Sequence, residues 1–127
     1  MTGNELFENA VDICALRSSL TNVPTDIDDL KQRAPALINL LLAENSSLDC
    51  RIRRVEHQVL KIDSLDGQIP CSDIVASAVL PYGLARLLML GEDDAFVVEV
   101  ERLYAEAKLI AIRFGKAKHG VVTEVYS

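Results

Sequence analysis

Apolar residues recur every three or four positions along much of this chain, the spacing that places side chains on one side of an α-helix. The stretch "NELFENAVDICALRSSL" shows it first, through Leu6, Ala10, Ile13 and Leu20. We therefore predict that residues 4–20 form a helix, which ends at "TNVP".

A second helix is predicted from Thr25 to Glu44. Thr25 is a suitable N-cap, and Asp28 and Asp29 in the first turn complement the positive end of the helix dipole. Pro35 has no backbone N–H, so we expect the helix to bend or restart there. Beyond it, "SSLDCRIRRVEHQ" could extend the helix or form a separate short one, and "QVLKI" alternates like a brief strand. The pattern leaves these alternatives open.

The third predicted helix, residues 72–90, is the most apolar stretch of the chain, yet "PYG" interrupts it. We expect a kink here, at which Pro81 bends the axis, Gly83 lets a neighbouring backbone approach closely, and Tyr82 buries its ring. The kink is expected in the bundle core, with a subunit contact as the alternative. Gly91 is well placed to end the helix in a left-handed conformation.

A fourth helix is predicted from the acidic "EDDAF" stretch to Phe114, and it carries two apolar stripes. A helix with two apolar faces needs two partners, because each face gains free energy only when it leaves water. The second partner is either another helix of this chain or a neighbouring subunit. The first stripe comprises Phe96, Val100, Leu103, Ala107, Ile110 and Phe114, and the second comprises Val98, Ala105, Leu109 and Ile112.

The character of the sequence changes after Phe114. "GKAKHG" is basic and bounded by glycines, and "VVTEVYS" has the β-branched residues of a strand. We expect residues 1–114 to form one helical bundle domain and residues 115–127 to form a tail that is flexible until it docks on a partner. The tail residues expected to make that contact are Lys116, Lys118, Val122 and Tyr126.

Together these patterns predict an all-α fold, a small bundle of about four helices with a kinked third helix and an extended C-terminal tail. The composition agrees with one small domain, since 127 residues, 50% of them apolar, can form a single core. Acidic residues outnumber basic ones by 19 to 13, which gives a net charge of −6. This charge disfavours binding to nucleic acid phosphates and to anionic membranes, because both reward basic patches.

Residues 74–90 are apolar enough to be considered as a membrane span. They are at the short limit for one, are followed by acidic "GEDD" and have no basic flank, so we expect no insertion. Cys14, Cys50 and Cys71 are widely spaced, so we expect small core residues of a reducing compartment rather than disulfides or a zinc site. The start of the chain shows no secretory signal, and we expect a cytoplasmic protein.

Candidate catalytic chemistry is sparse in this sequence. The two histidines, His57 and His119, lie in no recognisable motif and are interpreted as solvated surface residues. The sequence contains neither a glycine-rich phosphate loop nor a metal-hydrolase motif. We therefore expect no enzyme activity, no metal and no cofactor.

Arg51, Arg53 and Arg54 form the one tight basic cluster outside the tail. Their first interpretation is a solvated helix end, whose cations offset the negative end of the dipole or pair with nearby acids. The alternative is a docking patch for an acidic protein surface.

Three segments together resemble the small head-tail connector proteins of tailed bacteriophages. They are "RAPALINLLLAE" (33–44), "LPYGLARLLMLGEDD" (80–94) and "VERLYAEAK" (100–108). The resemblance covers roughly residues 5–114. In that family a helix with an L-P-x-G-L-A-like pattern is commonly followed by a short acidic turn and a further helix.

The resemblance implies an adaptor in the virion neck, made in the cytoplasm of the bacterial host. It implies a homo-oligomeric ring, with a dodecamer among the expected sizes, that sits under the portal protein and presents a surface for the next neck or tail protein. DNA passes through such a ring without sequence-specific binding, for which an acidic protein is suited.

Two features depart from the connector pattern: the segment from 59 to 72 is short for a long loop or hairpin, and the tail is short. The alternative is therefore a small cytoplasmic helical protein-binding module or chaperone without catalytic activity. Ring stoichiometry distinguishes the two functions.

Overall fold

A computed structural model describes residues 1–17, 27–56 and 58–125, with side chains described for 1–15, 27–56 and 58–114. The predicted all-α class is confirmed, because the described residues form α-helices and one short π-helix. In chain order these are α1 (Gly3–Arg17), α2 (Ile27–Glu44), α3 (Ser46–Arg53), η1 (Val75–Val79), α4 (Leu80–Leu88) and α5 (Asp94–Val125). Thr25, the predicted N-cap of the second helix, lies outside the described residues.

The described part of the chain has five α-helices where about four were predicted, and one extra break lies at Asn45. Helix α2 continues through Pro35 without restarting. The backbone of Asn45 departs from the helical conformation, at φ −101° and ψ 7°, and its buried side chain donates to the carbonyl of Leu41 at 2.9 Å. The segment after α2 is therefore a separate short helix, one of the two alternatives that the sequence left open.

The segment from 54 to 72 connects α3 to the next helix without forming a named strand in its described residues. Arg54, at φ 58°, ends α3 in the left-handed conformation, a role more often taken by glycine. Asn39 of α2 donates to the carbonyl of Ile62 and accepts from its N–H, at 2.9 and 2.7 Å. Gly3 donates to the carbonyl of Gly67 at 3.0 Å. These bonds hold the connection against α2 and the start of α1.

The predicted kink at Pro81 is not confirmed; the structure shows a change in helix type just before Pro81, where η1 passes directly into α4. Pro81 has no N–H to donate to the carbonyl four residues before it, and η1 lies directly upstream. A π-helix has a wider turn than an α-helix, and in η1 this turn is closed by the N–H of Leu80, which donates to the carbonyl of Val75 five residues earlier. Helix α4 ends at Leu88, earlier than predicted, with Met89 as its C-cap. Gly91 lies in the turn that follows and has the predicted left-handed conformation, at φ 86°.

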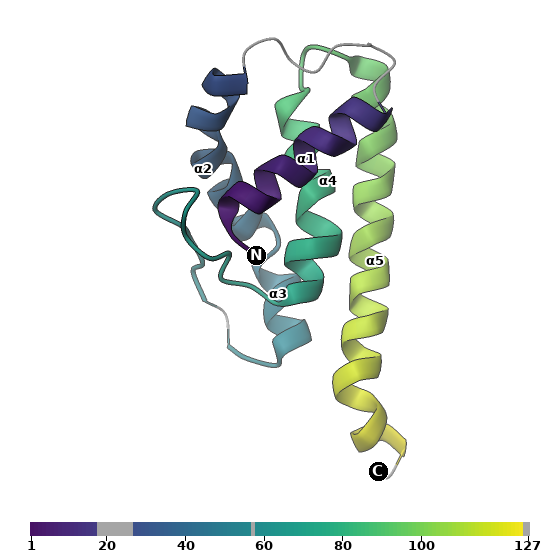
Figure 1. The fold of residues 1–127 in the computed structure, drawn as a ribbon. Coiled ribbons are helices and arrows are strands. Elements are labelled where there is room, and N and C mark those ends of the chain that lie inside the picture. Colours follow the sequence, from purple (N-terminus) through teal and green to yellow (C-terminus); the bar gives the residue numbers. More distant parts are fainter. Residues whose placement is uncertain (18–26, 57, 126–127) are drawn as a thin grey trace.

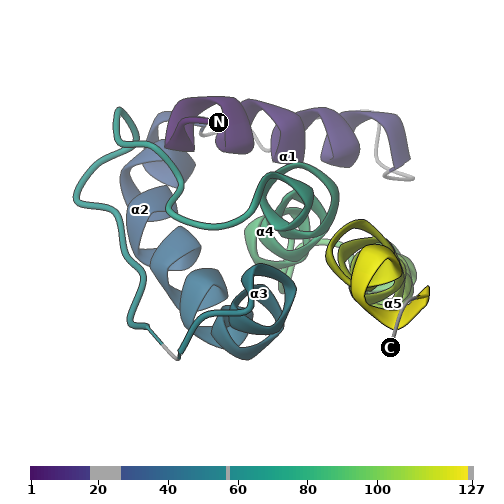
Figure 2. The same cartoon turned by 90° about the horizontal axis from the view of Figure 1, so that it is seen from below.

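Helix α4 lies at the centre of the bundle, with α1, α2, α3 and α5 arranged around it (Figure 2). This place explains its apolar composition, because α4 packs against α1, α2 and α5. Leu80, Leu84 and Ala85 have no exposed surface. The apolar core is continuous from α1 through α4 to α5.

Helix α5 begins at a cap formed by Asp93, which accepts from the N–H of Phe96 at 3.1 Å. It continues to Val125, so residues 115–125 extend a helix instead of forming the extended tail that was predicted. Gly115 and Gly120 each destabilise a helix by only about 1 kcal/mol relative to alanine. Because extending an existing helix is easier than starting a new one, α5 can continue through both positions. The lower end of α5 projects past the other helices in Figure 1.

Candidate interface on helix α5

The second apolar stripe of α5 faces solvent in this chain. We call Val98, Ala105, Leu109 and Ile112 the outer face. Val98 is 69% exposed and Leu109 is 60% exposed, while Ile112 is half-buried. The sequence predicted this stripe and left open whether the same chain or a second subunit covers it. No described helix of the chain covers Val98 or Leu109.

The first stripe is buried at its N-terminal end only. Phe96, Val100 and Ala107 are in the core, as predicted, but Ile110 and Phe114 are 48% and 63% exposed. The prediction is wrong at these two positions because the buried face of α5 passes through Tyr104 and Ala111, which are 4% and 0% exposed, and Ile110 and Phe114 lie to one side of it. Residues assigned to neither stripe complete the buried face: Val97, Tyr104 and Ala111.

A polar cluster joins α5 to the rest of the bundle beside the outer face. The buried Tyr104 hydroxyl donates to Glu44 at 2.8 Å and accepts from Asn45 Nδ2 at 2.7 Å. Lys108 Nζ lies 3.4 Å from the same Glu44 carboxylate and 4.0 Å from the Tyr104 ring centroid. Arg86 of α4 lies 3.5 Å from the other Glu44 oxygen. The cluster thereby connects α2, α4 and α5 at one point.

The electrostatics of this cluster favour an ionised Glu44. Burial raises the pKa of the Glu44 carboxyl, but the hydrogen bond from Tyr104 and the charges of Arg86 and Lys108 outweigh it, so the pKa is lowered overall. Burial also raises the pKa of the Tyr104 phenol, which stays protonated and able to donate.

The contribution of Glu44 to stability is expected to depend on pH. A carboxyl group whose pKa is lowered by folding stabilises the folded state above the unfolded-state pKa, and this stabilisation is lost as the pH falls through the folded-state pKa. Wild type should therefore exceed Glu44→Gln in free energy of unfolding at neutral pH, and this difference should shrink as the pH falls below the ordinary range of a glutamate carboxyl. Urea denaturation of both proteins across this range checks it, and a difference that does not change with pH would contradict the assignment.

The three residues of the predicted kink all lie in or against the core. Pro81 and Gly83 are buried, and Tyr82 is half-buried. A Cβ on Gly83 would lie 2.8 Å from Leu41 Cδ2 and 3.0 Å from the ring of Tyr104. The predicted close approach is therefore present, but the approaching groups are side chains of α2 and α5 and not a neighbouring backbone.

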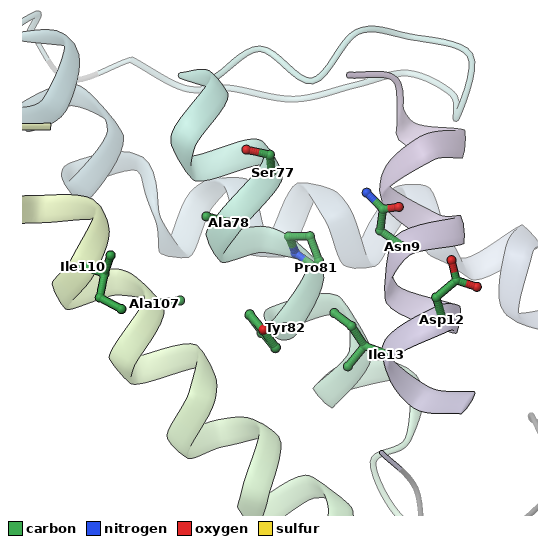
Figure 3. Close-up of a pocket in the computed structure, with 9 residues that line it drawn as sticks. All are labelled: Asn9, Asp12, Ile13, Ser77, Ala78, Pro81, Tyr82, Ala107 and Ile110. Carbon is green, nitrogen blue, oxygen red and sulfur yellow. The ribbon is translucent and has the colours of Figure 1, made fainter. Parts of the chain in front are cut away.

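An open groove of about 370 Å³ lies between α1 and α5, over the break at Pro81. Figure 3 shows Tyr82 lying between Ile13 of α1 and Ala107 of α5. We call this groove the α1 groove. Asn9 and Asp12 of α1 are exposed at its edge, and its remaining lining residues are Ser77, Ala78, Pro81 and Ile110.

The three arginines at the end of α3 have different environments. Arg53 Nε donates to the buried carboxylate of Asp49 at 2.7 Å, in agreement with the interpretation in which these cations pair with nearby acids. Arg51 and Arg54 are exposed at the end of α3 and stay candidates for a docking contact.

The predicted tail contacts fall on parts of the chain with limited description. Lys116, Lys118 and Val122 lie in the last turns of α5, and their side chains are outside the described set. Tyr126 lies outside the described residues. His57 is also outside them, as is the side chain of His119.

Chemically reactive groups are few among the described side chains. These residues include no group of three His, Cys, Asp or Glu side chains that could hold a metal ion. Burial raises the pKa of the thiols of Cys14 and Cys71 to about 12 in each case, which keeps both in the less reactive thiol form. Within the described ranges, no helix has the length and apolarity needed to cross a membrane.

Sequence reasoning identified the outer face but missed the polar cluster and the α1 groove. Comparisons of the chain with protein-family models, with curated proteins and with solved structures found no significant match.

Proposed function

We propose that this protein is a non-catalytic assembly component of the phage head-tail connector type, which works by packing against other protein subunits. The observation that carries the proposal is the exposed outer face of α5. Large apolar side chains exposed along one side of a long helix commonly mark a protein–protein contact. The outer face borders a shallow groove lined by Glu44, Arg86, Tyr104 and Lys108, so an apolar strip lies beside charged groups, as in many interfaces.

In this proposal, copies of the chain form a homo-oligomeric ring beneath a portal protein and present a surface to the next neck or tail protein. The helical fold agrees with the family that the sequence resembles. Side-by-side packing through α5 would make each subunit contact its neighbours along the longest helix of the chain. The proposal also predicts that the gene lies beside genes for a portal protein and a terminase.

Leu109→Asp is expected to weaken self-association at least about tenfold, because a carboxylate would have to leave water in an apolar contact. Leu109 is exposed in the single chain, so the variant should keep the wild-type melting temperature. Leu40→Asp is the matched control, since Leu40 is 54% exposed on α2, away from the outer face. Sedimentation velocity over a range of concentrations, alone and with the portal protein, measures all three proteins. Equal association of Leu109→Asp and wild type would overturn the role of the outer face.

A further inference from the structure

A separate hollow, of about 280 Å³, lies between α1 and the start of α2. We call it the α1–α2 hollow. Its apolar floor is formed by Phe7 and Val11 of α1 and by Ile27 of α2, which is 41% exposed. The rest of its lining is charged and consists of Glu8, Asp12, Asp28 and Lys31. The hollow therefore combines an apolar floor with an excess of negative charge.

Helix α1 gains no stability from its two carboxylates at this hollow. Glu8 and Asp12 are exposed and lie four positions apart, a spacing at which like charges disfavour an α-helix. Within the described part of the chain, neither carboxylate has an ion pair or a hydrogen bond to another side chain. Asp28 differs, because it lies in the first turn of α2, where the helix dipole favours an acid. The charge of Glu8 and Asp12 is therefore available to a cation from outside the chain.

The C-terminal end of α5 has the complementary sequence pattern. Lys118, Val121, Val122 and Val125 follow the spacing i, i+3, i+4 and i+7, so these four positions fall on one face of the helix. A face with this spacing is the kind by which amphipathic helices dock in apolar grooves. Here it places one cation beside three apolar residues, which matches a hollow with an apolar floor and exposed carboxylates.

These two surfaces lie at opposite ends of the molecule. Figure 1 shows the start of α2 near the top and the C-terminal end of α5 near the bottom, where it projects past the other helices. Helix α5 is continuous to Val125, so its end leads away from the hollow of the same chain. A contact between the two surfaces therefore joins two copies. Because the surfaces differ, repeated contacts of this kind link subunits head to tail.

We propose that the α1–α2 hollow of one copy receives the C-terminal end of α5 from a second copy of this chain. The valines of that end pack on the apolar floor, and Lys118 approaches Glu8 and Asp12. This inference rests on the proposed self-assembly and adds a contact that is separate from the outer face. Its repetition closes a ring when the rotation between neighbours divides a full turn, and otherwise gives an open filament.

Exchange of the two charges tests the pairing. Glu8→Lys and Lys118→Glu should each weaken self-association at least about fivefold, because like charges then meet across the contact. The double variant restores opposite charges and should return to within about twofold of wild type. Glu8→Lys places opposite charges four positions apart on α1, so it should keep the wild-type melting temperature. Glu56→Lys, at an exposed position after α3, is the control for the same change of charge.

Ile27→Asp tests the apolar part of the contact without altering the end of α5. Ile27 is the first residue of α2, where the helix dipole favours an acid, so the variant should fold like wild type. It should nevertheless lose at least about tenfold in self-association, because a carboxylate would have to leave water in an apolar contact.

Sedimentation velocity at concentrations where wild type associates, alone or with the portal protein, distinguishes the outcomes, with Leu109→Asp measured in the same series. If Glu8→Lys and Ile27→Asp associate like wild type while Leu109→Asp does not, the hollow is not a contact, and the proposed function survives without this inference. A double variant that associates as weakly as the single charge variants also overturns the pairing. If wild type itself forms no oligomer, alone or with the portal protein, the proposed function and this inference fail together.

Discussion

Replacing Gly83 with leucine should prevent this chain from folding. Even the Cβ of the new residue would lie 2.8 Å from Leu41 Cδ2 and 3.0 Å from the Tyr104 ring, before any further atom is added. Leu41 is fully buried, and hydrogen bonds to Glu44 and Asn45 hold the hydroxyl of Tyr104, so neither neighbour has room to move away. Overpacking a dense core costs about 1–3 kcal/mol for small insertions, and leucine adds far more than a methyl group.

Gly83→Ala gives the graded form of the same test. Alanine favours a helix over glycine by about 1 kcal/mol, so a net loss of about 1 kcal/mol or more shows that the close approach outweighs this gain. Circular dichroism and thermal melting measure both variants. Ala43→Leu, at an exposed position on α2, is the control for added volume. A Gly83→Leu protein with the wild-type melting temperature would refute the packing argument.

Asp49→Ala should lower the free energy of unfolding by about 2–4 kcal/mol. The Asp49 side chain is almost fully buried, and its two oxygens accept from the backbone N–H of Ser72 and from Arg53 Nε, both at 2.7 Å. Truncation leaves both donors without this acceptor. The bond to Ser72 also joins α3 to the start of the helix that contains η1, so the effect extends beyond one ion pair.

An exposed pair of the same type provides the comparison for Asp49. Arg33 and Asp29 have the same four-residue spacing on α2, but both side chains are more than half exposed. Asp29→Asn is therefore expected to cost less than about 1 kcal/mol. Urea denaturation measures both variants, and a loss for Asp49→Ala as small as that for Asp29→Asn would contradict the structural role of the buried carboxylate.

The sequence pattern predicted those features that depend on near neighbours in the chain. Apolar spacing indicated the main helices, Gly91 indicated a left-handed backbone position, and the spacing of Val98, Ala105 and Ile112 indicated the outer face. Each of these depends on the repeat of an α-helix or on the conformational freedom of glycine. Such signals can be read without knowledge of the tertiary packing.

Features that depend on distant residues could not be predicted in the same way. Tyr104 meets Glu44 across 60 positions of sequence, and Lys108 meets the same carboxylate across 64. Asn45, at the boundary between α2 and α3, belongs to that same cluster, because its side chain donates to the hydroxyl of Tyr104. The extension of α5 to Val125 was missed for a different reason, since the β-branched residues near the C-terminus favour a strand locally, whereas the structure continues the helix through them.

The central claim, that copies of this chain assemble through α5, is tested most directly by native mass spectrometry of the full-length protein. The measurement covers a wide concentration range, alone and with the portal protein, because a template raises the effective concentration of weakly interacting subunits. The account predicts one discrete oligomer larger than a dimer, either free or on the portal. A monomer or dimer at every concentration, with no defined complex on the portal, would contradict it.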